Sequence, residues 1–383
     1  TPNVRHHVQY GVQYTYHTLR PRTGEAEGVE GDAFQTSRIR PKYAHETAFY
    51  VSDDWNLTDK LLLSLGLRSS HFMQVGPFNY YLFNQNEQVV DSVYYDSNAT
   101  VKNFHNLEPR ASLRYTLNSR SSVKAAFARS AQYLHLVSNA YTTLPLDVWV
   151  PSSAIVEPQR ANQYALGYFR SMNENQYEGS VEVYYKTMEN QLEYREGYAV
   201  GPTNRDLEYE FVSGSGESYG VELFLRKNIG DLQGWVGYTL SRTTRQFPDL
   251  NQGATFPARF DRRHDLSVVA NYKLNDKWTF GGTFVYGTGQ AITMPVRRYA
   301  VEGSVVYQYG DRNSFRMEPT HRLDLAATLE GKKYKNIQNS FTFSIYNVYG
   351  RRNPFLYYID NEGEPYSQDI KLQAKKVSII PFP

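Results

Sequence analysis

Hydrophobic and polar residues alternate strictly along many segments of this chain. In the first segment, Val8, Tyr10, Val12, Tyr14 and Tyr16 are separated by single polar residues or glycine. Successive side chains of a β-strand point to opposite faces, so this spacing predicts a strand with one apolar and one polar face. The same alternation returns in segments 61–67, 107–117, 123–127, 164–168, 177–185, 219–225, 232–240, 266–274, 278–286, 323–329 and 341–345.

The lengths and connections of these segments favour a membrane barrel. We expect about 14 strands of roughly ten or more residues each, which is the length of a tilted membrane-spanning strand. No segment has a helical period, so the predicted fold class is all-β. Short polar turns are expected at 56–59, 118–121, 172–175, 228–231, 275–276 and 330–338, and long loops near 18–42, 74–105, 136–160, 189–215, 245–260 and 290–317. This arrangement is typical of a transmembrane antiparallel up-and-down β-barrel whose short turns face the periplasm.

Composition agrees with a membrane barrel and leaves a soluble sandwich or propeller with a tyrosine-rich surface as the alternative. Aromatic residues make up 15% of the chain and include 33 Tyr, a residue type enriched at membrane interfaces. The mean hydropathy of −0.59 fits both classes, because barrel strands alternate apolar and polar residues. The chain has no Cys, which excludes disulfides and thiolate metal sites. Its net charge of +2 indicates no field that would attract nucleic acid.

Groups suited to catalysis or metal binding are few. Asp261, His264 and Asp265 form the densest cluster, and they could make a metal or catalytic site where a strand begins. The favoured interpretation is that these charged residues cap the strand at its junction with a loop and pair with one another. The acidic turn 360–364 could hold Ca²⁺, but a solvated turn is favoured there. Phosphate-loop, nucleophile-elbow and zinc-protease patterns do not occur. We therefore expect no enzyme activity, no cofactor and no bound metal.

The long loops hold residues suited to a ligand vestibule. Such a site needs exposed aromatic groups and a few convergent polar groups. The candidates in or beside the 136–160 and 290–317 loops are Tyr133, His135, Tyr141, Trp149, Arg297 and Arg298. Packing within the loops, or a place on the rim that faces lipopolysaccharide, is an equal alternative for any one of them. The six residues therefore mark a neighbourhood for the ligand.

Several motifs resemble strand signatures of TonB-dependent receptors from Bacteroidetes-type bacteria. The first two are LEPRASLRY at 107–115 and SAQYLHL at 130–136. Others follow in the family's order at 219–223, 238–242, 257–266, 283–289 and 345–354, and the last resembles the penultimate strand of that group. The likeness runs from about residue 47 to the end of the chain.

This resemblance implies a barrel of about 22 strands whose lumen is closed by a plug domain. We expect residues 1–383 to be the C-terminal portion of such a barrel, a fragment that lacks the plug and about eight of the barrel strands. Fourteen strands of such a barrel would leave two unpaired edges in lipid, which is unfavourable.

The function implied by the resemblance is active transport of a scarce nutrient across the bacterial outer membrane. Extracellular loops and the plug would bind a small-molecule, glycan or peptide substrate, and the TonB complex would act through the plug. Outer-membrane lipid is a further partner, and a surface lipoprotein, common among relatives, is a candidate. A plug-free barrel acting as a pore or a surface binding and adhesion protein is the alternative. An outer-membrane hydrolase is a third hypothesis.

Overall fold

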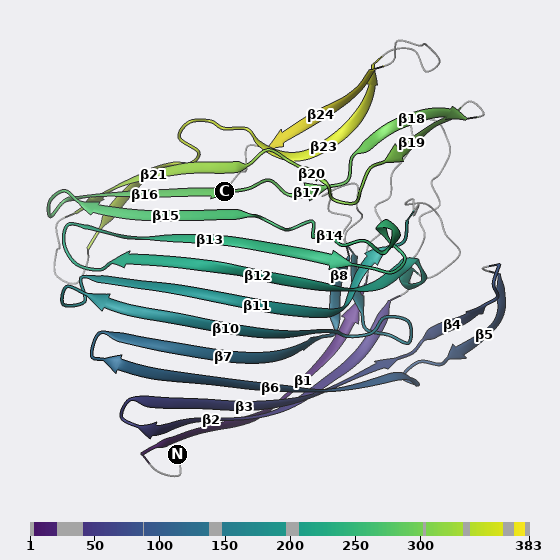
Figure 1. Cartoon of the computed structure of the whole chain (residues 1–383), viewed down its shortest axis with the longest axis horizontal. Helices are drawn as coiled ribbons and strands as arrows, with labels where there is room; N and C mark the ends of the chain where they lie inside the picture. Colours follow the sequence, from purple (N-terminus) through teal and green to yellow (C-terminus); the bar gives the residue numbers. More distant parts are fainter. Residues whose placement is uncertain are drawn as a thin grey trace.

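Long antiparallel strands run side by side across the molecule in the computed structural model (Figure 1). The structure describes residues 4–20, 41–86, 88–137, 148–196, 207–301, 304–331, 338–362 and 371–379. In these residues the largest sheet has 14 strands, of which thirteen follow one path and β14 (Phe256–Pro257) pairs with β13. The thirteen are β1 (His6–Leu19), β2 (Lys42–Thr58), β3 (Leu61–Val75), β6 (Thr100–Asn118), β7 (Ser121–Gln132), β10 (Gln159–Met172), β11 (Tyr177–Tyr194), β12 (Phe211–Lys227), β13 (Leu232–Gln246), β15 (His264–Lys273), β16 (Trp278–Gly287), β21 (Thr320–Glu330) and β22 (Ser340–Ile345).

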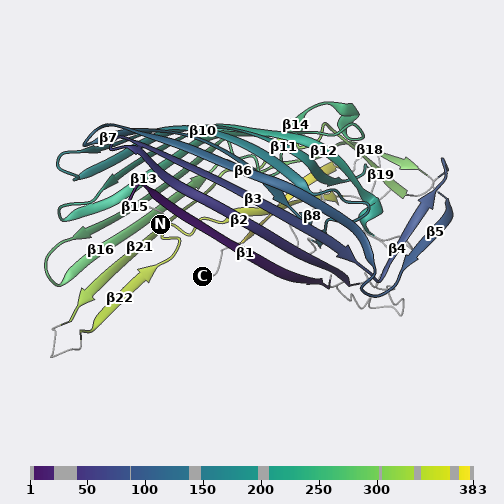
Figure 2. The same cartoon turned by 90° about the horizontal axis from the view of Figure 1, so that it is seen from below.

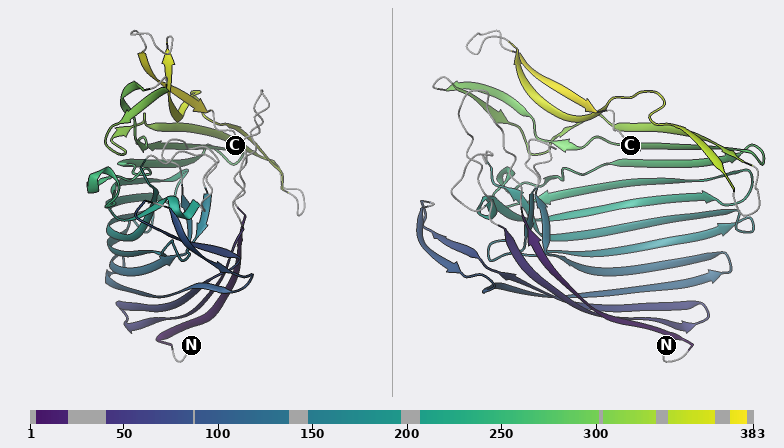
Figure 3. Two further views of the ribbon diagram at one scale, coloured as in Figure 1. Left: turned by 90° about the vertical axis from the view of Figure 1, so that its right-hand side faces the viewer. Right: turned by 180° about the vertical axis from the view of Figure 1, so that it is seen from behind.

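Strands adjacent in this sheet follow one another along the chain, which confirms the predicted up-and-down topology. The tight turns lie at one end, on the left in Figure 1, and the sheet curls when it is seen end-on (Figure 3, left). In the part of the chain that the structure describes, no helix is long and apolar enough to cross a membrane.

The long connections contain more regular structure than the sequence predicts. Most of their elements lie beyond the long-loop end of the strands, on the right in Figure 1, and the view from below shows β4 and β5 projecting from that end (Figure 2). They are β4 (Phe78–Phe83), β5 (Val89–Tyr95), β8 (Leu134–Val137), β9 (Val148–Pro151), β17 (Ala291–Ile292), β18 (Pro295–Val301), β19 (Ser304–Tyr309), β20 (Phe315–Arg316), β23 (Asn353–Glu362), β24 (Lys371–Ile379) and the 3₁₀ turns η1 (Leu207–Glu210) and η2 (Asn251–Gly253). The loop expected at 74–105 is thus mainly the β4–β5 hairpin.

The segment 345–354, which resembles the penultimate strand of the family, contains a turn between two strands. Strand β22 ends at Ile345, and β23 begins at Asn353 and pairs with β24 outside the main sheet. Between them Asn347 has a φ of 53°, in the left-handed region that Asn tolerates better than most residues. Its side chain accepts a hydrogen bond from Arg351 N at 3.1 Å and donates one to Arg351 O at 2.9 Å. This local turn separates the two strands.

The apolar face of the strands is the exposed face. Tyr10, Val12 and Tyr14 are 82%, 66% and 61% exposed. The strand register places Val12 opposite Phe49, which is also exposed, so the apolar face continues from β1 onto β2. A large exposed apolar surface marks contact with lipid or with a partner, and on alternating strands of this length it is the lipid-facing band of a barrel. The opposite, polar face is therefore the lumen wall.

On β3 the apolar band covers only the part of the strand nearest the tight turn. On β3 the outward positions from Leu61 to Leu67 are all Leu, and the next two are Ser69 and His71. Strands β3 and β6 contain 15 and 19 residues, whereas a tilted strand crosses the bilayer with about 9–11. The surplus residues extend past the lipid at the long-loop end. The clusters of buried apolar side chains also lie at this end.

Candidate functional site

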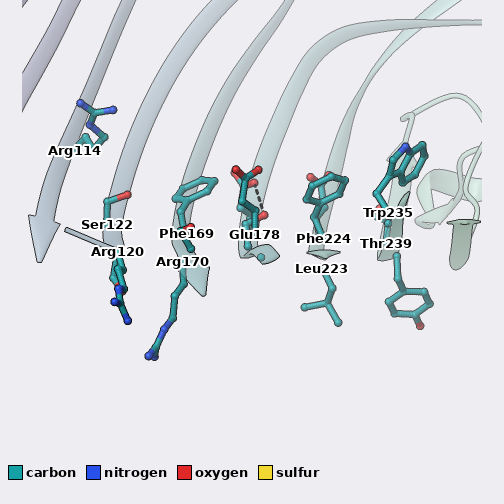
Figure 4. A pocket seen from close by; sticks show the side chains of 18 of the residues that line it. Arg114, Arg120, Ser122, Phe169, Arg170, Glu178, Leu223, Phe224, Trp235 and Thr239 are labelled. Atoms are coloured by element: carbon teal, nitrogen blue, oxygen red, sulfur yellow. Dashed lines mark hydrogen bonds between the residues drawn. The ribbon is translucent and has the colours of Figure 1, made fainter. Parts of the chain in front are cut away.

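A broad, open pocket of about 880 Å³ lies on the lumen wall near the tight turns. Phe169 of β10, Phe224 of β12 and Trp235 of β13 point into it from neighbouring parts of the sheet (Figure 4). The ring centroids of Phe224 and Trp235 are 6.0 Å apart. In the same view Arg170 and Leu223 point to the opposite side of the sheet. The pocket therefore presents a row of aromatic rings on a face that is otherwise polar.

Carboxylates lie among these rings, and Glu178 stands between Phe169 and Phe224 (Figure 4). The register places Glu182 of β11 directly opposite Glu222 of β12, and Glu178 and Asp265 also line the pocket. Two like charges opposite each other in a sheet repel, so this pair requires a hydrated environment. Arg114 lies at one end of the row, beyond Phe169 (Figure 4). The wall can therefore hold water, polar chain segments and apolar groups side by side.

Tyr133, predicted to be a ligand residue, is buried by other side chains of this chain. It is 4% exposed, and its ring stacks on Phe72 with centroids 4.8 Å apart. Its hydroxyl accepts a hydrogen bond from Asn106 Nδ2 at 2.9 Å and donates to Ser70 Oγ at 2.8 Å, because the hydroxyl of Ser70 donates to Glu108. Burial is the main cause that raises the pKa of the Tyr133 phenol above its usual value. Tyr133 thus belongs to a polar network in the wall.

Sequence analysis did not identify the charged members of this network. Arg68 Nε lies 3.4 Å from Glu108 Oε1, and Arg68 Nη2 lies 3.4 Å from Glu46 Oε1. Glu46 also bonds to His17 Nε2 at 3.0 Å. Glu108 and Tyr133 fall within two of the motifs that carried the family resemblance, so the network joins those motifs in space. Polar residues that recur on the inward face of four strands are the signal that could have identified it.

His135 and Trp149 lie on the small β8–β9 hairpin, but only Trp149 is open to solvent. His135 is 1% exposed, and its Nε2 lies 3.0 Å from Ser152 Oγ. Desolvation by burial lowers the pKa of His135 to about 4, so its imidazole is neutral at pH 7. Trp149 is 53% exposed and pairs across the hairpin with Leu136, which is also exposed. The hairpin therefore presents an apolar face outward and keeps the imidazole inside.

The remaining predicted ligand residues are placed apart from this hairpin. Arg297 and Arg298 lie on the β18–β19 hairpin, where Arg297 is exposed and Arg298 half-buried. Tyr141 lies outside the described residues. The structure therefore places Tyr133, His135 and Trp149 at or beside the β8–β9 hairpin, whereas the two arginines lie on the β18–β19 hairpin. That these residues bind a ligand stays a prediction.

The acidic and histidine cluster at 261–265 does not converge on one point. Buried Asp261 accepts a hydrogen bond from Thr243 N at 2.6 Å and forms an ion pair with Arg316. His264 Nδ1 lies 2.8 Å from the Tyr238 hydroxyl, and the next side chain, Asp265, lines the lumen pocket. These contacts agree with the interpretation that the charged residues form pairs where a strand meets a loop.

In the described part of the chain, no group of three or more His, Asp or Glu side chains could hold a metal ion. Part of the acidic turn 360–364, from residue 363 onward, lies outside the described residues, so the Ca²⁺ alternative for that turn stays untested.

Comparisons with known proteins agree with this architecture. The family model described as TonB dependent receptor-like, beta-barrel, matches residues 2–348. A search of curated protein sequences finds no match.

Solved structures share the fold at low sequence identity. The ferripyoverdine receptor of Pseudomonas aeruginosa is 18% identical with a TM-score of 0.54, over 92% of this chain and 42% of that chain. The iron transporter FrpB of Neisseria meningitidis is 14% identical with a TM-score of 0.58, over 92% of this chain and 49% of that chain. The ferric preacinetobactin receptor of Acinetobacter baumannii is 16% identical with a TM-score of 0.55, over 97% of this chain and 50% of that chain.

This chain therefore spans about half the length of the structures it resembles. The Bacteroidetes type suggested by its motifs stays a prediction. The family match covers most of the sequence, and the lipid-facing band and polar lumen wall are those of an outer-membrane barrel. The chain belongs to the TonB-dependent receptor β-barrel family of the bacterial outer membrane.

Proposed function

We propose that this chain is the C-terminal barrel portion of a transporter that takes up a scarce nutrient across the outer membrane at the expense of TonB-delivered energy. The family match over residues 2–348 is the observation that carries the proposal. The extracellular hairpins would bind the nutrient, and the lumen wall would guide it toward the periplasm. No covalent chemistry on the substrate is part of this function.

The lumen wall supports a role as a passage. Its pocket of about 880 Å³ is lined by Ser, Thr, Glu and Arg side chains together with the row formed by Phe169, Phe224 and Trp235. Such a surface suits a polar domain that fills the barrel and moves during transport. We propose that a plug domain, carried by a part of the protein outside residues 1–383, packs here and contacts TonB.

Uptake by living cells tests the proposal. A strain with the intact receptor gene should take up the nutrient, and removal of either the receptor or TonB should abolish uptake. A receptor whose TonB-contacting segment is deleted provides the matched control, because it keeps the barrel and loops.

Uptake that persists without TonB would overturn energised transport. Purified receptor that conducts ions steadily in planar bilayers would then favour the plug-free pore. Loss of surface attachment with unchanged uptake would favour the adhesion protein.

A further inference from the structure

A second pocket, of about 210 Å³, lies at the long-loop end of the barrel and is bordered by three arginines. Arg245 lies near the long-loop end of β13, Arg259 follows β14, and Arg312 follows β19. The first two come from the segment around the β13–β15 connection, and the third comes from the connection between β16 and β21. Sequence analysis did not select any of them.

The lining of this pocket carries more positive than negative charge. Glu193 is the acidic side chain among the described residues that line it. Its Oε1 accepts a hydrogen bond from Arg245 Nη1 at 2.8 Å, and its Oε2 accepts one from Arg312 Nη2 at 2.9 Å. By formal count the described lining holds three guanidinium groups and one carboxylate, a net charge of +2. An arrangement of this kind attracts a dianion.

One donor of this arrangement has no acceptor in the part of the chain that the structure describes. Arg245 Nε is buried, and no described residue accepts its hydrogen. A buried donor without an acceptor costs free energy, which a ligand oxygen would recover. Planar guanidinium groups bind carboxylates with two parallel hydrogen bonds, so the ligand oxygens best suited to this site belong to carboxylates.

The other side of the pocket is apolar. Leu136, Leu192 and Phe260 line it, and Phe260 is 63% exposed. The guanidinium of Arg259 lies over the Phe260 ring, 5.5 Å from its centroid. Exposed aromatic and aliphatic groups beside cations favour a ligand that combines negative charge with a flat apolar part.

We propose that this pocket, which we call the arginine pocket, binds a small dianion made of two carboxylates on an aromatic or apolar body. Arg245 and Arg312 hold the carboxylates, and Phe260 packs against the body. The inference rests on the proposed function, since it assigns the chemical class of the nutrient or of the part of it that is recognised first. Binding itself requires no energy from TonB.

Purified full-length receptor in detergent can be titrated with isophthalate, an aromatic dicarboxylate, and binding can be followed by saturation-transfer NMR. The neutral isophthalamide is the matched probe, and we expect it to bind at least about tenfold more weakly. Arg245→Gln and Arg312→Gln should each weaken isophthalate binding by about tenfold or more. Glutamine keeps a donor for Glu193, which limits the disturbance of the fold.

Two further variants keep the test independent of misfolding. Glu193→Gln removes the competing carboxylate and should strengthen isophthalate binding, a change that a damaged protein would not produce. Arg242→Gln alters an exposed arginine that lies on the same strand as Arg245 but does not line the pocket. The affinity of this variant for isophthalate should equal that of the wild type.

Equal binding of isophthalate and isophthalamide, or unchanged binding after Arg245→Gln, would overturn the arginine pocket. The two proposals fail separately. Dianion binding without TonB-dependent uptake would remove the transport function and leave the pocket. TonB-dependent uptake with no dianion binding would remove the pocket and leave the transport function.

Discussion

The tight-turn end and the long-loop end of this barrel are built in different ways. At the tight-turn end, neighbouring strands are joined by a few residues, as at Asn118–Ser121, and each strand contacts the next one along the chain. At the long-loop end, contacts join distant segments. Lys42 bonds to Glu208 at 3.0 Å, and Arg312 to Glu193 at 2.9 Å, across 166 and 119 residues of sequence.

The environment explains this difference. A strand in lipid is stable when every backbone polar group is hydrogen-bonded and the outward side chains are apolar. The alternating pattern supplies these apolar side chains, and pairing with the neighbouring strands supplies the hydrogen bonds. Beyond the lipid, water and long connections allow many arrangements, and buried charges must find specific partners. The structure of the tight-turn end is therefore determined by local sequence, and the structure of the long-loop end is determined by contacts between distant segments.

The largest effect is expected from a charge placed on the lipid-facing band. Leu65→Arg puts a guanidinium on the exposed apolar face of β3, between Leu63 and Leu67. Near the bilayer midplane this substitution costs about 2–4 kcal/mol of folding free energy. A urea titration of the receptor reconstituted in phosphatidylcholine bilayers measures the loss.

Ser64→Arg is the matched control for this prediction. Ser64 is the preceding residue on the same strand, so its side chain faces the polar lumen wall. We expect a cost well below that of Leu65→Arg. Equal costs for the two variants would contradict the assignment of the lipid-facing and lumen faces.

The sequence predicts the tight-turn end almost completely. The alternation around Tyr10 and along Leu61–Leu67 identified both the strands and the exposed face, and the turn at Asn118–Ser121 was placed at its observed position. Strand periodicity and turn chemistry are local properties, and lipid removes most competing arrangements. The alternation also ends at Ile345, where β22 ends, but it gives no sign of the turn that follows, because that turn depends on a left-handed Asn347.

A smaller and more local effect is expected at the long-loop end when the pH falls. The pKa of His135 is lowered by burial from 6.5 to about 4, so the folded β8–β9 hairpin binds a proton less readily than the opened one. Above pH 6.5 both forms are neutral. As the pH falls from 6.5 to 4, protonation favours the opened form, by up to about 3 kcal/mol for a shift of this size.

Hydrogen exchange of the hairpin amides, corrected for the intrinsic rate at each pH, measures this effect. Protection of residues 134–137 and 148–151 should decrease between pH 6.5 and pH 4 and should change little above pH 6.5. In His135→Gln, the part of the pH dependence that comes from this imidazole should disappear. The same pH dependence in the variant would mean that another group controls the opening.

The candidate site could be predicted only in outline. The sequence pointed to the stretch around Tyr133, His135 and Trp149, which the structure does bring together. It could not show that Tyr133 and His135 are buried, because their neighbours come from other strands. Arg245 and Arg312 were missed for the same reason, since Arg245 of β13, Arg312 of the connection after β19 and their shared partner Glu193 of β11 are far apart in sequence and no local pattern links them.

The smallest effect is expected from a single tight turn. Asn118 Oδ1 accepts a hydrogen bond from Arg120 N at 2.9 Å and closes the turn between β6 and β7. The turn is exposed, so water replaces the lost bond in Asn118→Ala, and the cost should be about 0.5–1 kcal/mol in the same urea titration. Ser119→Ala, in the same turn, is the control and should change the stability still less. Neither variant should alter isophthalate binding, because the arginine pocket lies at the other end of the strands. A loss from Asn118→Ala as large as that from Leu65→Arg would mean that turn chemistry, and not the lipid-facing band, determines the stability of this end.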